Sequence, residues 1–247
     1  MRFAIGVIVL FALSFGGVFW FGSTSSAPVS VDVVELLKKE PEEYSRIYAA
    51  FRKINADEIS EFNRALIAYS KHENLKALRQ DIGGLMLRVI GNEAGNLPRS
   101  GRPWLEKITR KTLGLTRQYN KHGEDFCFLS SHHDHPNAEK LLRDRLSDKE
   151  AAEFIAGFKA ERFELAVLML EAIVEGGQKP VAVPGVNQAE LEQALIEAAS
   201  GEDADVLRKM RNDQRSCEEI IALLDSALNI RDQNTRHAML AELNPGG

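Results

Sequence analysis

The chain has 247 residues and carries 31 lysines and arginines against 36 aspartates and glutamates, which gives a formal net charge of −5. This length suits one domain, or one domain with an appendage. The negative charge argues against a nucleic-acid partner, because nucleic acids are bound through basic surfaces. The charge is nevertheless uneven: residues 99–138 hold seven basic and four acidic side chains, whereas 139–247 hold thirteen and twenty-one.

The N-terminus begins with an apolar run. Residues 3–21 contain no charged side chain, and a run of about 20 apolar residues is long enough to cross a membrane as a helix. We therefore expect residues 1–22 to form an uncleaved signal-anchor helix and residues 23–30 a flexible tether. A cleaved secretory signal peptide is the alternative interpretation.

Arg2 sets the expected orientation, because it is the only charge before the apolar run and positive residues stay on the cytoplasmic side. We expect a single-pass protein of the inner membrane, with its N-terminus in the cytoplasm and its C-terminal domain in the periplasm. No Asn-x-Ser/Thr glycosylation acceptor occurs, which fits a bacterial periplasm better than a eukaryotic lumen. If the signal is cleaved, the chain is secreted to the periplasm instead.

Apolar spacing predicts an all-α fold, in which an exported multi-helix bundle follows the membrane helix. We expect a main helical domain over 31–178, a proline-containing connector over 179–187, and a C-terminal helical segment over 188–247 packed on the main domain. Helices are predicted over 31–39 and 42–54, or as one helix bent at Pro41; from Asp57 to Gly91; from Pro103 onward; over 137–146; from Ser147 to Gly176; from Asn187 to Gly201; as one long helix through 206–228; and over 235–243.

The segment 99–121 is basic and amphipathic, with a tryptophan on its apolar side and lysines and arginines opposite. Such helices lie on anionic membranes or bind acidic protein surfaces, and the acidic C-terminal half of this chain offers one such surface. A solvated face held on the domain by its apolar side is the structural alternative. The candidate interaction surface consists of Arg99, Arg102, Trp104, Lys107, Arg110 and Lys111.

Two cysteines, Cys127 and Cys217, fall in the part of the chain expected to be exported. An even, minimal number of cysteines in an oxidising compartment predicts one disulfide between them. Two buried thiols are the alternative, because Cys217 lies on the apolar stripe of its predicted helix.

Three histidines, His132, His133 and His135, lie within four consecutive positions and form a candidate metal site. Zinc requires three or four ligands in tetrahedral array, and two adjacent histidines rarely face one ion, so a further ligand must come from elsewhere in the chain. The structural alternative is a helix N-terminus, in which Pro136 occupies the first turn and His135 or Asp134 caps it. Sensing of pH by the histidines is a third interpretation.

These observations leave three hypotheses about function. The first is a membrane-tethered, periplasmic helical interaction protein, an accessory or scaffold subunit of an envelope complex, with the membrane bound through 3–21 and a protein partner in the envelope. The second is a metal-dependent hydrolase that uses the histidine cluster with zinc. The third is a module that binds anionic lipid through 99–121. We favour the first, which involves neither enzymatic activity nor a cofactor, because a Gly-rich phosphate loop, a Gly-x-Ser-x-Gly elbow and a His-Glu-x-x-His motif are absent from the sequence.

Overall fold

The computed structural model describes residues 42–54, 60, 63–64, 84–86, 88–121, 148–209 and 216–244. Every regular element within these residues is a helix, so the predicted all-α class is confirmed for them. No helix in this part of the chain is both long enough and apolar enough to cross a membrane. The predicted anchor (1–22) and tether (23–30) lie outside the described residues.

Seven α-helices and one 3-10 helix are traced in the described part of the chain, and residues 84–86 and 88–93 are also helical. The traced helices are α3 (Glu42–Ile54), η1 (Ala94–Ser100), α6 (Arg102–Asn120), α9 (Asp148–Gln178), α10 (Gln188–Ala198), α11 (Glu202–Lys209), α12 (Cys217–Asn229) and α13 (Gln233–Leu243).

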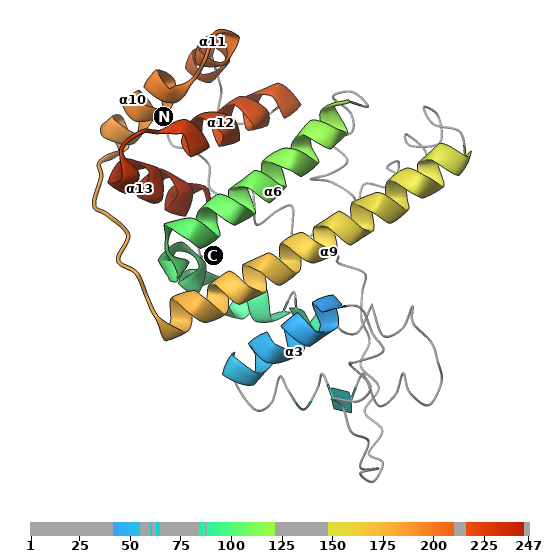
Figure 1. Ribbon diagram of the computed structural model, residues 1–247. Helices are drawn as coiled ribbons and strands as arrows, with labels where there is room; N and C mark the ends of the chain where they lie inside the picture. The colour runs from blue at the N-terminus through green and yellow to red at the C-terminus, as the bar shows by residue number, and fades with distance from the viewer. Residues whose placement is uncertain are drawn as a thin grey trace.

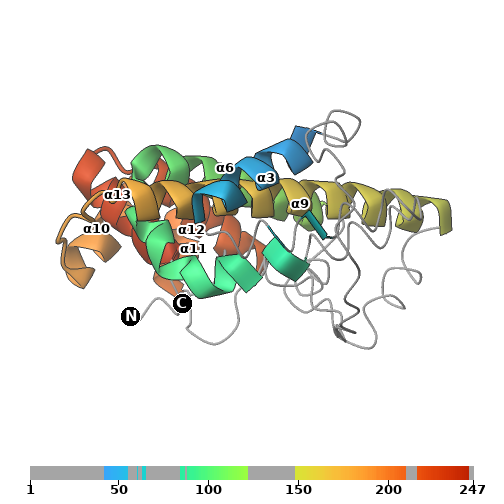
Figure 2. The same ribbon diagram turned by 90° about the horizontal axis from the view of Figure 1, so that it is seen from below.

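The long helix α9 and the helix α6 form the centre of the bundle (Figure 1). The helix α9 contacts α3, η1 and α6. The helices α12 and α13 pack against α6, and α10 and α11 cover α12. Seen from below, α9 extends beyond the described ends of the other helices (Figure 2). The C-terminal segment thus packs directly on α6, a helix of the main domain.

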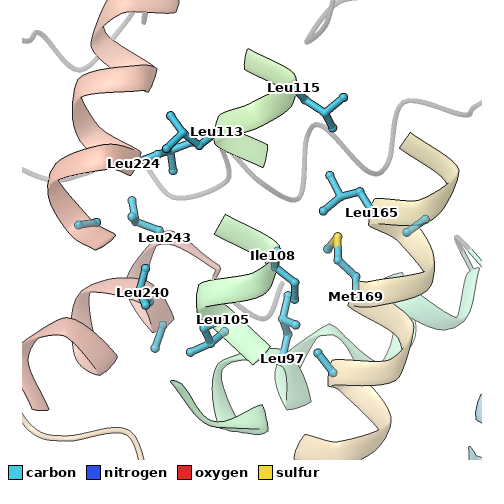
Figure 3. Close-up of a cluster of buried hydrophobic side chains, with 14 of the residues drawn as sticks. Leu97, Leu105, Ile108, Leu113, Leu115, Leu165, Met169, Leu224, Leu240 and Leu243 are labelled. Atoms are coloured by element: carbon cyan, nitrogen blue, oxygen red, sulfur yellow. The ribbon is translucent and has the colours of Figure 1, made fainter. Parts of the chain in front are cut away.

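The hydrophobic core lies on both sides of α6 (Figure 3). Leu105 and Ile108 of α6 are completely buried, as are Leu165 and Met169 of α9. Burying one such side chain fully contributes about 1.5–3 kcal/mol. Because leucine and isoleucine recur at helical spacing on two sides of α6, the helix is held between α9 and the pair α12–α13, and its remaining side stays exposed.

Glycine permits a close approach between α9 and η1. A Cβ atom on Gly176 would lie 2.0 Å from the carbonyl oxygen of Asn96 and 3.0 Å from the backbone nitrogen of Ser100. The sequence analysis expected the helix to stop at Gly176, but α9 continues to Gln178. The glycine therefore serves to admit a neighbouring backbone rather than to end the helix.

Helix caps confirm some predicted boundaries and correct another. Asn187 caps α10, where its side chain accepts a hydrogen bond from the backbone N–H of Glu190 at 2.9 Å, as its sequence position predicts. The expected long helix through 206–228 is wrong, because Ser216 has an extended backbone and caps a separate helix, α12, which begins at Cys217. Ser216 and Glu219 form a capping box there, with each side chain accepting a hydrogen bond from the other residue's backbone N–H.

A further correction concerns the residues before α6, for which no helix was predicted between Gly91 and Pro103. They form the 3-10 helix η1, which includes Pro98 and ends at Gly101. Gly101 has a φ of 86°, a backbone conformation that residues other than glycine rarely adopt. The chain therefore turns sharply from η1 into α6 at this glycine.

Candidate interaction surface on helix α6

The packing of α6 between its neighbours leaves one stripe of the helix exposed. Side chains at spacings of three and four residues share a helix face, and the exposed positions from 103 to 121 follow this spacing. They cover about 27 Å along the helix at 1.5 Å per residue. We call the basic members of this stripe the α6 cationic row: Lys107, Arg110, Arg117 and Lys121.

Lys111, predicted as part of the interaction surface, lies at the junction of α6 and α9 instead. Its ammonium group binds the carboxylates of both Glu161 and Glu164. Burial alone would lower the pKa of Lys111, but the hydrogen bonds to the two glutamates and their negative charges together outweigh it, so that the pKa is raised above the ordinary value of 10.5. Lys111 thus contributes to packing within the molecule.

Two further cations of this region also meet carboxylates of the same chain. Arg102 lies 3.8 Å from Glu106, whose carboxylate is 3.3 Å from the Nε of Arg236 in α13. Arg117, although a member of the cationic row, donates to Asp225 of α12 at 2.9 Å. The acidic C-terminal half of the chain therefore neutralises part of the basic segment.

Trp104 is half-buried and packs against the core. The ammonium of Lys107 lies 4.7 Å from the centroid of its ring, a cation–π contact of about 0.5–1 kcal/mol at an exposed site. The tryptophan is therefore covered by the core on one side and by Lys107 on another, which leaves little of its ring for insertion into a membrane.

Three predicted surface residues remain exposed: Arg99, Lys107 and Arg110. Within the described part of the chain none of them forms an ion pair with a carboxylate. Arg117 and Lys121 have a structural reason for their charge, since cations near a helix C-terminus are favoured by the helix dipole. Lys107 and Arg110 lie nearer the N-terminus of α6, where the helix dipole does not favour a positive charge. These two residues therefore form the centre of the candidate surface.

Several predicted site residues lie outside the described residues: Cys127, His132, His133 and His135. Cys217 is completely buried at the start of α12, and its disulfide with Cys127 stays a prediction. Within the described residues, no group of three or more histidine, cysteine, aspartate or glutamate side chains could hold a metal ion. The zinc hypothesis rests on the histidine cluster and likewise stays a prediction.

Two exposed valines next to this surface were missed by sequence reasoning, which treated 179–187 only as a connector. The backbone N–H of Val181 donates to the carbonyl of Arg99 at 2.8 Å, so the connector is held at the end of η1. Val183, two residues further along the connector, is also exposed. The signal in the sequence was the pair of valines between two prolines, Pro180 and Pro184.

Comparisons of the chain with protein-family models, with curated proteins and with solved structures found no match in any of the three.

Proposed function

We propose that this protein is a membrane-tethered helical interaction protein of the periplasmic face, an accessory or scaffold subunit of an envelope complex, and that it docks an acidic protein surface with α6. The expected anchor over 3–21 and the short tether hold the helical bundle near the membrane. No nucleic acid is involved in this proposal.

The observation that carries the proposal is the selective pairing of charges on α6. Cations that point to neighbouring helices are neutralised, as Lys111 is by Glu161 and Glu164. Lys107 and Arg110, on the exposed side, have no carboxylate within the described residues. Cations with no carboxylate partner on a rigid helix are suited to steering and orienting an oppositely charged partner.

The test is co-purification of the full-length protein from its native membrane, with its neighbours identified by mass spectrometry. The variant Lys107→Glu/Arg110→Glu reverses the centre of the candidate surface. Arg52→Glu/Lys53→Glu is the matched control, because both residues are exposed in the last turn of α3 and the charge change is the same.

We expect the wild type and the α3 variant to retain the same neighbour, and the α6 variant to lose it by about tenfold or more, since like charges facing across an interface cost several kcal/mol. Circular dichroism of each variant reports whether the helices are intact. Equal recovery of the neighbour by all three proteins would contradict the proposed docking surface.

A further inference from the structure

The end of η1, the start of α6 and the connector meet at one corner of the molecule (Figure 1). We call this the valine corner and define it by Arg99, Pro103, Lys179, Val181 and Val183. All five residues are exposed. Val181 and Val183, at 44% and 39% exposure, are the large hydrophobic side chains that the described part of the chain leaves most open to solvent.

The two valines are exposed although the connector is held in place. Val181 is fixed by the hydrogen bond from its N–H to Arg99, and its Cγ2 atom would lie 3.2 Å from a Cβ atom on Gly101. At the other end, Val186 packs against the core. The structure therefore presents an apolar tip from a connector tied at both ends, so little ordering is needed when the tip is buried against another surface.

Two cations, Arg99 and Lys179, belong to the valine corner. Arg99 has no ion pair with a carboxylate among the described residues, and the side chain of Lys179 is 76% exposed while lying 3.6 Å from Glu175. Along the connector, the next carboxylate after the valines is Glu190, in the first turn of α10. The valine corner is thus an apolar tip flanked by cations.

We infer that the valine corner docks on the surface of an anionic phospholipid bilayer, with the valines at the boundary of headgroups and acyl chains and the cations at the lipid phosphates. This inference rests on the membrane tether of the proposed function. Residues 23–41 separate the predicted membrane helix from α3, and nineteen residues reach at most about 68 Å when extended. A tethered bundle therefore stays within reach of the bilayer, which raises the effective concentration of a weak contact.

The apolar residues available to contact the lipid differ from those expected from the sequence. The sequence hypothesis placed Trp104 at the lipid surface, but Trp104 packs against the core beneath Lys107. The valines of the connector are exposed instead, beside Arg99 of the same basic segment. In this inference, cations of 99–121 still attract the lipid phosphates, and the valines of the connector replace Trp104 in the apolar contact with the bilayer.

The experiment measures hydrogen–deuterium exchange of the full chain in two kinds of nanodisc, one of phosphatidylcholine and one of an equimolar mixture with phosphatidylglycerol. We expect the amides of Ala182, Val183 and Gly185 to exchange at least about threefold more slowly in the anionic discs, because headgroups exclude water from a docked backbone. High salt should remove this protection, since it screens the attraction to the phosphates.

Two variants distinguish docking from a general effect of charge. Val181→Asp/Val183→Asp should lose the protection. Ala189→Asp/Gln193→Asp should keep it, because it adds the same charge at exposed positions of α10. Protection that is equal in both discs, or that survives Val181→Asp/Val183→Asp, would overturn the inference.

Retention of the chain by washed discs tests the tether separately. A chain that washes out of both discs would overturn the tether and this inference together. A chain that is retained without lipid-dependent protection would overturn this inference alone. Protection that arises only on adding the co-purified neighbour would assign the corner to the protein partner and overturn lipid docking.

Discussion

His237 is a buried histidine at the contact between α13, η1 and α6, and its charge is coupled to folding. Burial lowers its pKa below the ordinary value of 6.5, a hydrogen bond to the carbonyl of Pro98 opposes this shift, and the positive charge of Arg102 adds to it. Its Nε2 atom has no hydrogen-bond partner among the described residues. The charged group that acts on it is Arg102, which itself lies 3.8 Å from Glu106. The native state therefore favours the neutral imidazole.

We expect this histidine to destabilise the fold in mild acid. Because the native pKa is lowered, the unfolded chain binds the proton more readily as pH falls below about 6.5, and the free energy of unfolding falls by about 1.4 kcal/mol per unit of pKa difference. His237→Asn keeps a donor for the Pro98 carbonyl but does not titrate. Urea unfolding at about pH 7.5 and pH 5.5 should show a smaller loss for this variant than for the wild type. An identical loss in both proteins would exclude His237 as its source.

Sequence reasoning did not single out His237, and it concentrated instead on the cluster at His132, His133 and His135. The reason is that a lone histidine in a helix carries no local signal. Its burial depends on α13 packing against η1, which is distant in the sequence.

The contact between α9 and η1 depends on a residue with no side chain. Gly176 lies inside α9, and the backbone of Asn96 occupies the space that a Cβ atom would need. A glycine inside a helix costs about 1 kcal/mol relative to alanine. The close packing of the two helices offsets this cost, which explains why the helix passes through a residue that otherwise favours its end.

Gly176→Ala should destabilise the protein by about 2 kcal/mol or more, because the added methyl group forces α9 and η1 apart. Gly114→Ala is the matched control. It lies in α6 with nothing within 4 Å of its added Cβ atom, so it should stabilise by about 0.5–1 kcal/mol. Thermal and urea unfolding measure both changes, and a neutral or stabilising Gly176→Ala would contradict the close approach.

Some helix boundaries can be predicted from interactions between residues that are close in the sequence. The predicted helix 42–54 coincides with α3, and Pro103 falls in the first turn of α6 as expected. The capping box of Ser216 and Glu219 is also local, yet the apolar spacing on either side of it suggested one continuous helix. In this case the cap, rather than the periodicity, determines where α12 begins.

The whole molecule is built by packing its C-terminal helices on α6, so a covalent link between the two halves would add stability. The predicted disulfide joins Cys217, buried in α12, to Cys127, which lies outside the described residues. On the chain-entropy model, closing this loop of about 90 residues contributes roughly 3–5 kcal/mol. Two buried thiols would contribute through packing alone.

Titration of thiols in denaturant distinguishes these alternatives. Without reductant we expect no reactive thiol in the unfolded wild type, and two after reduction. Cys127→Ser should lower the free energy of unfolding by roughly 3–5 kcal/mol under oxidising conditions and by much less under reducing conditions. Two reactive thiols in the unreduced, unfolded protein would refute the disulfide.

Several features follow from the sequence without reference to neighbours. The helical class, the helix 42–54 and the cap at Asn187 rest on propensity, apolar spacing and short-range hydrogen bonds, which act within a few residues. The basic character of 99–121 is likewise evident from composition. None of these features requires knowledge of what the helix packs against.

Tertiary packing decided which of these basic residues are exposed. Periodicity predicts that α6 has an apolar face and a polar face, but it does not say which helices border the polar face. In the structure, Glu161 and Glu164 of α9 form ion pairs with Lys111, and Trp104 packs against the core. The connector places Val181 beside Arg99. These contacting residues lie far from α6 in the sequence. Only the tertiary structure therefore shows which basic side chains stabilise the fold and which are exposed for binding to another molecule.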